Sequence, residues 1–287
     1  MVRPDKKRKG ALWVIALILL LTLVFSLTAL FALKDDLTVT EYKISPQDLP
    51  GDLNGVRIAL VADLHNEEFG NDQAELISAI CLSEPDIIVL CGDILDSIEQ
   101  DLEPIEELLE GISHIPTYAV YGNHENRVSI FDRGDLASLY KSYGVTLLVD
   151  SFETITINNA ELCITGMNDP AAWGKGDLEF VQNNPPSVTP SETAFNILLC
   201  HRANIYPAIS DLGFDLILSG HLHGGHVRIP LVGGLIAPNR ELFPKYTSGV
   251  YYENSSCLVV SRGLGSNYEI PRIFNPPELV IITLSSN

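Results

Sequence analysis

The sequence is poor in cysteine, with five in 287 residues. The five are scattered, odd in number and mostly set inside apolar runs, so we interpret them as small buried hydrophobic residues. No two of them form a Cys-x-x-Cys pair, which argues against a zinc ribbon or a thioredoxin-type redox site. The cysteine pattern therefore predicts neither a disulfide scaffold nor a thiolate metal site.

Basic residues are scarce outside the amino terminus. Residues 34–287 hold 13 lysines and arginines against 36 aspartates and glutamates, whereas residues 1–33 hold five basic residues and one acid. An acidic body of this kind repels phosphate backbones, so we expect no nucleic acid partner and no long-range attraction to an anionic surface. A small phosphate ligand is still compatible with this charge if metal ions supply the positive charge. The sequence predicts no particular protein partner.

Charge is absent from residues 11–33, a run of 23 residues. As a helix this run would span about 34 Å, which matches the hydrocarbon core of a bilayer. A cleaved signal peptide and a buried core helix are the alternatives, but the run is long for a signal peptide and no clear cleavage site precedes Lys34. We therefore interpret it as an uncleaved transmembrane signal anchor. The positive-inside rule then predicts a single-pass protein of the cell membrane, with residues 1–10 a basic cytoplasmic segment and the body extracytoplasmic.

The body alternates strand-like and helix-like patterns after a connector at residues 34–55. Strands are expected at 39–44, 56–62, 87–90, 116–121, 145–149, 154–157, 162–165, 196–200, 216–219, 227–229, 249–252, 257–261 and 278–284. Helices are expected at 73–82, 105–110, 135–143 and 205–212, with a short one inside a surface loop at 174–190. Gly233-Gly234 is interpreted as a turn. The pattern predicts an α/β fold of two mixed β-sheets packed as a sandwich and flanked by helices, one domain at 56–287.

Several strand-like runs end at side chains that bind metal ions. Asp63 and His65 follow the run ending at 62, Asp93 follows 87–91, Asn123 and His124 follow 116–121, His201 follows 196–200, and His221 and His223 follow 216–219. Strand ends are where α/β sheets place their chemistry. Carboxylate, amide oxygen and imidazole together suit a borderline divalent ion such as Mn²⁺, Fe²⁺, Co²⁺ or Zn²⁺. The set is large enough for two ions about 3.5 to 4 Å apart, if one carboxylate bridges them, and both could then hold one phosphoryl group.

These motifs resemble a known family in type and in order. Asp63-x-His65, Gly92-Asp93-x-x-Asp96, Gly122-Asn123-His124-Glu125, His201 and Gly220-His221-x-His223 are similar to the signature blocks of the calcineurin-like metallophosphoesterase superfamily. Segments 224–230, 245–251 and 261–265 are similar to its bacterial membrane-associated branch, the YaeI/YkuE-type phosphodiesterases. The resemblance therefore covers nearly all of the chain after the anchor. His226 departs from that branch, which often has glutamine there.

The resemblance implies a role for each motif residue. One ion would be bound by Asp63, His65 and His223, the other by Asn123, His201 and His221, with Asp93 as the bridge between them. A hydroxide activated between the two ions would attack phosphorus, and His124 would protonate the departing oxygen as general acid.

Other polar residues near the motifs have more than one interpretation. Asp96 and Glu125 are expected to orient ligands or to cap helices. We interpret Arg127, Arg202 and Arg262 first as surface or fold-stabilising charges, with a clamp on substrate phosphate as the alternative. His226 either lines the pocket or has a structural role.

The motifs and the resemblance together imply a membrane-anchored phosphoesterase with two divalent metal ions, Mn²⁺, Fe²⁺ or Zn²⁺, that hydrolyses phosphate esters, of which phosphodiesters are the expected substrates. Its substrate would be a small-molecule or lipid-linked phosphoester. A non-catalytic metal-binding scaffold of the same fold and a phosphomonoesterase or protein phosphatase are the alternatives. The His-x-His-x-Asp-His cluster of a metallo-β-lactamase-type hydrolase is absent.

Overall fold

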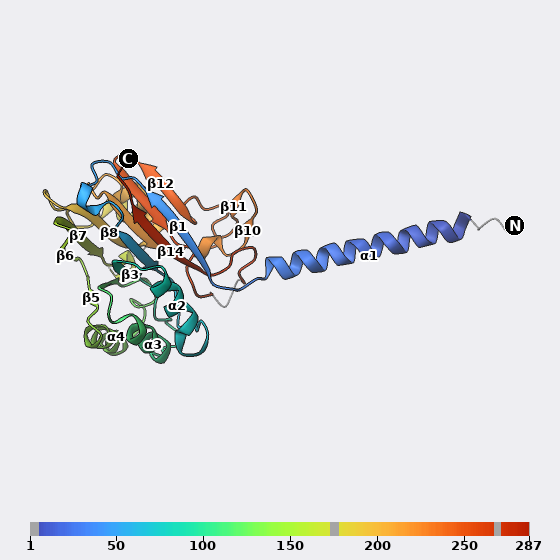
Figure 1. The fold of residues 1–287 in the computed structure, drawn as a ribbon, viewed down its shortest axis with the longest axis horizontal. Helices are drawn as coiled ribbons and strands as arrows, with labels where there is room; N and C mark the ends of the chain where they lie inside the picture. The colour runs from blue at the N-terminus through green and yellow to red at the C-terminus, as the bar shows by residue number, and fades with distance from the viewer. Residues whose placement is uncertain (1–5, 173–177, 267–270, 287) are drawn as a thin grey trace.

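A long amino-terminal helix leads into a folded body (Figure 1). The computed structural model describes residues 6–172, 178–266 and 271–286. Helix α1 spans Lys6–Ala32, and its segment Leu12–Ala32 is long and apolar enough to cross a membrane without being buried against the body. A helix in the predicted position is thus confirmed. Residues 1–5 of the predicted basic segment, and residues 174–177 of the predicted surface loop, lie outside the described residues.

The body contains two six-stranded sheets and a small two-stranded one. In spatial order the first sheet consists of β1 (Thr38–Ile44), β14 (Glu278–Leu284), β2 (Arg57–Val61), β3 (Ile87–Cys91), β4 (Thr117–Val120) and β5 (Thr146–Leu147). The second consists of β12 (Gly249–Glu253), β13 (Ser256–Val260), β9 (Leu216–Gly220), β8 (Phe195–Arg202), β7 (Ala160–Met167) and β6 (Ser151–Ile157). Strands β2 to β5 run parallel, while β14 is antiparallel to β2. In the second sheet β7 and β8 are parallel, while β6 is antiparallel to β7. Two mixed sheets were predicted, and the prediction is confirmed.

The two sheets pack face to face because their strands are apolar on both sides. In β2, Ile58 and Leu60 enter the core between the sheets, whereas Ala59 and Val61 face the helices. This is the alternation of a strand with one residue on each face in turn. Both faces of the central strands are therefore buried, and the sheets lie between two layers of helices.

Helices cover the outer face of each sheet (Figure 1). The first sheet is covered by α2 (Ala74–Leu82), α3 (Glu103–Ile112) and α4 (Ile130–Ser142), and the second by α5 (Leu178–Asn183) and α6 (Tyr206–Ile209). Short 3-10 helices are η1 (Gly51–Leu53), η2 (Asn71–Gln73), η3 (Pro170–Ala172), η4 (Ala203–Ile205) and η5 (His223–Gly225). Helix α3 buries Ile105, Leu108, Leu109 and Ile112, the spacing of one helix face.

The strand at the start of the predicted connector belongs to the first sheet. Strand β1 pairs in parallel with β14, from Thr38 against Glu278 to Ile44 against Leu284. The last strand of the chain therefore lies between β1 and β2, and the folded body begins at Thr38.

Two local predictions are wrong. Gly233–Gly234, interpreted as a turn, forms β11 and pairs antiparallel with β10 (Arg228–Ile229). The helix predicted at 205–212 is reduced to the single turn of α6 after η4. The chain turns away at Gly213, whose φ of +90° is a left-handed value that glycine adopts without strain.

Candidate metal centre

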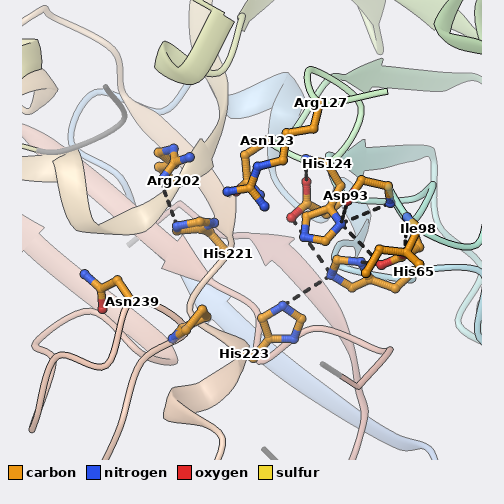
Figure 2. A pocket seen from close by; sticks show the side chains of 13 residues that line it. His65, Asp93, Ile98, Asn123, His124, Arg127, Arg202, His221, His223 and Asn239 are labelled. Carbon is orange, nitrogen blue, oxygen red and sulfur yellow. Dashed lines mark hydrogen bonds and ion pairs between the residues drawn. The ribbon is translucent and has the colours of Figure 1, made fainter. Parts of the chain in front are cut away.

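The end of β8 and the loops after β2, β3, β4 and β9 meet at one edge of the sandwich. They bring all eight predicted site residues together at a cavity of about 390 Å³, and Figure 2 shows those that line it. Six of them line the cavity: His65, Asp93, Asn123, His124, His221 and His223. Asp63 and His201 lie beneath, 0% and 1% exposed. Residues up to 160 positions apart in the sequence thus share one site.

One cluster of ligand-type atoms consists of Asp63, His65 and His223. The Nε2 atoms of His65 and His223 are 3.3 Å apart, and His223 Nε2 lies 3.7 Å from Asp63 Oδ1. All three side chains are buried. Two imidazole nitrogens and a carboxylate facing one another at this range form a set that a divalent ion would fit.

A second cluster consists of Asp93, His201 and His221. Asp93 Oδ2 lies 3.1 Å from His201 Nε2, which is 3.2 Å from His221 Nδ1. The same Asp93 oxygen lies 3.9 Å from His65 Nε2 of the first cluster. Asp93 therefore stands between the two clusters, where a bridging carboxylate would have to be.

The buried amide oxygen of Asn123 tests whether the second cluster suits a cation. Asn123 is 3% exposed, and its Oδ1 has no hydrogen-bond partner among the described residues. A buried acceptor without a partner costs free energy, and a bound cation would supply the missing partner. The donor set of carboxylate, amide oxygen and imidazole therefore fits a divalent ion.

Hydrogen bonds orient the imidazole rings of the site. Asp96 Oδ2 lies 3.3 Å from His65 Nδ1 and 3.2 Å from His124 Nδ1, so each ring can donate a proton to it. His201 Nδ1 lies 2.8 Å from the carbonyl oxygen of Cys91. These contacts place a proton on Nδ1 of His65 and of His201, so Nε2 is the nitrogen that faces the clusters and would bind an ion when deprotonated. Asp96 thus orients a predicted ligand, as the sequence suggested.

Glu125 joins the loop after β3 to the loop after β4. Its buried carboxylate accepts hydrogen bonds from the backbone N–H of Gly122, Asp93, Ile94 and Leu95, at 2.8, 2.9, 2.7 and 3.1 Å. The glutamate of the Gly-Asn-His-Glu motif therefore fixes the position of Asp93 through the backbone, rather than facing the cavity itself.

The backbone of the site is held in conformations that most residues avoid. Asp63, His65, Asp93, His221 and His223 all have left-handed φ values, between 46° and 74°. Such values cost free energy for residues other than glycine and are concentrated at functional sites. A Cβ on Gly122 or Gly220 would collide with the carboxylates of Asp93 and Asp63, respectively, which explains the glycine in each motif.

Burial and neighbouring charges shift the pKa values of the clustered groups. Burial raises the pKa of Asp63, although the charge of His201 opposes the shift. Burial also penalises a charged Asp93, but the charge of His201 and its hydrogen bond outweigh it and hold the Asp93 pKa well below its usual range. Burial lowers the pKa of His221, and the charge of Arg202 lowers it further. His221 is thereby kept neutral, which is the form of imidazole that binds metal ions.

Two of the three candidate arginines line the cavity. Arg202 donates from Nε to Asp169, 2.6 Å away, and its Nη1 lies 2.9 Å from His221 Nε2. Arg127 extends over the cavity from the loop after β4 (Figure 2). Arg262 instead pairs with Glu278 at 2.9 Å, so its interpretation as a fold-stabilising charge is confirmed.

His226 is fully buried and does not line the cavity. Its ring stacks on that of His223, with centroids 5.1 Å apart. Of the two interpretations, the structural one is confirmed.

Sequence reasoning missed Asp169, which holds Arg202 in place. Asp169 follows the end of β7, so it stands at a further strand exit, and the rule that found the other site residues would have found it too. Ser97 and Asn239, which also line the cavity, lie in loops whose sequence carries no such signal.

Comparison with known proteins agrees with this geometry. A family model described as calcineurin-like phosphoesterase matches residues 56–225, a range that includes all eight predicted site residues. An uncharacterized metallophosphoesterase, YkuE, of Bacillus subtilis (strain 168) is 28% identical over 252 residues, which cover 86% of this chain and 85% of YkuE. Phosphodiesterase YaeI of Escherichia coli (strain K12) is 30% identical over 234 residues, 79% of this chain and 82% of YaeI. A transmembrane protein with metallophosphoesterase domain from Bos taurus is 29% identical over 245 residues, 78% of this chain and 52% of that protein.

Proposed function

Because this chain belongs to the calcineurin-like phosphoesterase family, we propose that it is a membrane-anchored phosphodiesterase whose site holds two divalent metal ions. A metal-dependent phosphoester hydrolase is the activity that the family and the ligand clusters support. The preference for diesters and the attachment to a membrane are the parts of the proposal that go beyond that activity. The observation that carries the proposal is Asp93, which lies between two clusters of buried ligand-type atoms.

Each ion has its own set of ligands in this proposal. Asp63, His65 and His223 would hold one ion, and Asn123, His201 and His221 would hold the other, with Asp93 placed between the two sets. Bound ions would supply Lewis-acid polarisation of the phosphoryl oxygens and a water molecule of lowered pKa as the nucleophile. The donor types fit Mn²⁺, Fe²⁺ or Zn²⁺.

His124 is the general acid in this proposal. Its ring lines the cavity, and its Nδ1 is engaged by Asp96 Oδ2 at 3.2 Å and by Ser97 Oγ at 3.1 Å. In the imidazolium form Nδ1–H is donated to Asp96 and Nε2 carries the second proton, which passes to the departing oxygen of the ester. The backbone N–H of His124 also donates to Asp93 Oδ1 at 2.8 Å, which ties the acid to the bridging carboxylate.

Arg127 and Arg202 contact the substrate phosphate in this proposal. Both line the cavity, in a body whose charge is otherwise strongly acidic. Asp169 directs Arg202 by accepting from Nε, and Nη1 of the same guanidinium lies 2.9 Å from His221 Nε2 at the cavity. A guanidinium presents parallel donors that match phosphate oxygens, so the two side chains would fix the ester over Asp93.

The substrate we propose is a phosphodiester, small or lipid-linked. The relative named Phosphodiesterase YaeI supports the diester, and α1 supports a site held near a membrane. A relative named as a transmembrane protein with the same domain supports that pairing of anchor and fold. We place the amino terminus in the cytoplasm and the body outside, following the basic residues before α1.

The test is turnover by the full chain in detergent, loaded with Mn²⁺. Hydrolysis of bis-p-nitrophenyl phosphate is compared with that of p-nitrophenyl phosphate, with Asp93→Asn as the inactive variant and Asp211→Asn, an exposed carboxylate, as the matched control. We expect faster diester turnover in the wild type and the control, and none in Asp93→Asn. Faster monoester turnover would contradict the diester preference. Two ions bound with neither ester cleaved would favour the scaffold alternative.

A further inference from the structure

The hairpin formed by β10 and β11 carries an apolar tip on the surface of the body. The tip consists of Ile229, Pro230, Leu231, Val232 and Gly233, and a hydrogen bond from Val232 N–H to the Ile229 carbonyl closes the turn at 3.0 Å. Leu231 is 108% exposed and Val232 65% exposed. Large aliphatic side chains gathered at a protruding turn are a feature of surfaces that bind another apolar phase.

The backbone conformation that exposes Leu231 at the tip is unfavourable in free energy. Leu231 has a φ of +69°, a left-handed value that a bulky residue rarely adopts. Within the described residues this conformation gains no burial for the side chain, which points away from the body. A strained and fully exposed leucine is unfavourable in water, and the strain would be offset if the side chain entered an apolar medium.

The tip lies beside the end of the predicted membrane helix. Phe31 in the last turn of α1 and the five tip residues line the same hollow of about 690 Å³. The helix end is fixed to this part of the body, because the Phe274 N–H donates to the Ala32 carbonyl at 2.7 Å. Figure 1 shows β10 and β11 on the side of the body from which α1 leaves. The tip therefore continues the apolar surface of α1.

We infer that the tip enters the bilayer that α1 spans and forms a second membrane contact beside the helix. This inference rests on the membrane anchor of the proposed function. The exposed surface of the tip would contact the lipid of the leaflet next to the body. Aliphatic side chains without charge suit the acyl region of that leaflet, and the net acidity of the body is no obstacle because the contact is apolar.

A docked tip would also set the position of the metal centre relative to the bilayer. The hairpin packs on η5, which carries His223: a Cβ on Gly225 would collide with the backbone of Gly234. The loop that follows β11 reaches the rim of the cavity with Pro238 and Asn239. Two membrane contacts, α1 and the tip, would thus hold the cavity at a fixed orientation, which favours a phosphoester that is itself held in the bilayer.

The test measures the depth of the tip in a membrane. The full chain carries Cys81→Ser, since the other four cysteines are buried, and a single new cysteine labelled with the environment-sensitive fluorophore NBD. The labelled positions are Leu231→Cys at the tip, Leu21→Cys in α1, and Phe152→Cys as the matched control. Phe152 is an apolar residue, 65% exposed, on β6 at the end of the body away from α1 (Figure 1). Each protein is reconstituted into phosphatidylcholine vesicles that contain lipids with a quencher at a known acyl depth.

At position 231 we expect a blue-shifted emission that quenchers at a shallow acyl depth reduce. At position 21 we expect quenching by quenchers at a deep acyl position. At position 152 we expect neither a blue shift nor quenching. A label at 231 that behaves like the one at 152, while that at 21 is quenched, would overturn the inference and leave the anchor intact. Loss of quenching at 21 would refute the anchor, and the tip contact with it. A blue shift at 231 without quenching by lipid would also overturn it, because a second copy or another protein would then cover the tip.

Discussion

Asp93 and His124 are neighbours in the site but have separable roles in this account. Asp93 faces both ligand clusters, whereas His124 lines the cavity, donates its backbone N–H to Asp93 and packs edge-on against the ring of His65, with centroids 4.5 Å apart. Removing the bridging carboxylate should therefore affect metal binding and turnover together. Removing the acid should affect turnover alone.

We predict that Asp93→Asn lowers the metal content of the purified protein and abolishes turnover. His124→Gln should keep about the same metal content as the wild type, while turnover falls by about 10²- to 10⁴-fold, the usual contribution of a positioned acid. Metal content is measured by elemental analysis of dialysed protein, alongside initial rates. A His124 variant that loses its ions would show that His124 is a ligand and not the acid.

At the scale of the elements, the strand ends could be predicted from the sequence, but the contacts that hold the loops after them could not. Apolar runs such as 87–91 are recognisable because both faces of a buried strand are apolar, and the motif residues follow them directly. The contacts of Glu125 with four backbone N–H groups join two loops, and no local pattern encodes such a contact. The prediction for Gly233–Gly234 was wrong because glycine signals a turn, whereas here Gly234 permits close packing against η5.

The Glu125 carboxylate should be needed for the fold of both loops. In Glu125→Gln the side-chain amide would point at least one N–H group toward backbone donors and leave one or more of them without an acceptor. Each buried donor left without a partner costs about 1 to 3 kcal/mol. We predict a decrease in the free energy of unfolding of about 2 kcal/mol, measured by urea denaturation. Glu192→Gln, at an exposed position, is the control and should be unchanged.

The strand cysteines give a prediction about pH. Burial raises the pKa of Cys200 to about 12, and burial likewise raises the pKa of Cys257 to about 12. A raised thiol pKa means that the reactive thiolate is scarce below that pH. We predict that both thiols of the folded protein react with iodoacetamide far more slowly than the half-buried Cys81 at pH 7 and at pH 9, as followed by mass spectrometry. Modification of either thiol as fast as that of Cys81 would contradict the burial.

At the scale of the whole molecule, both ends of the body meet in one sheet. Strand β1 forms the edge beside β14, with seven paired residues from Thr38 to Ile44, and β14 in turn pairs with β2. The sequence indicates each strand but not this pairing, because strands 240 residues apart carry no local signal for one another. The predicted connector is consequently part of the structure that holds the last strand in place.

This pairing predicts where a soluble fragment has to begin. A fragment of residues 36–287 retains β1 and should unfold cooperatively, whereas a fragment of 56–287 lacks it and exposes the β14 edge, including the backbone groups that pair with β1. We expect the shorter fragment to aggregate or to melt at a lower temperature, as measured by circular dichroism and light scattering. Equal stability of the two fragments would show that β1 is dispensable.

The two-ion centre is the central claim, and a crystal structure of the Mn²⁺-loaded protein with anomalous diffraction tests it most directly. We predict two anomalous peaks. One should lie among Asp63, His65 and His223, the other among Asn123, His201 and His221, with Asp93 within bonding distance of both. A single peak, or two peaks with Asp93 bound to only one, would contradict the account.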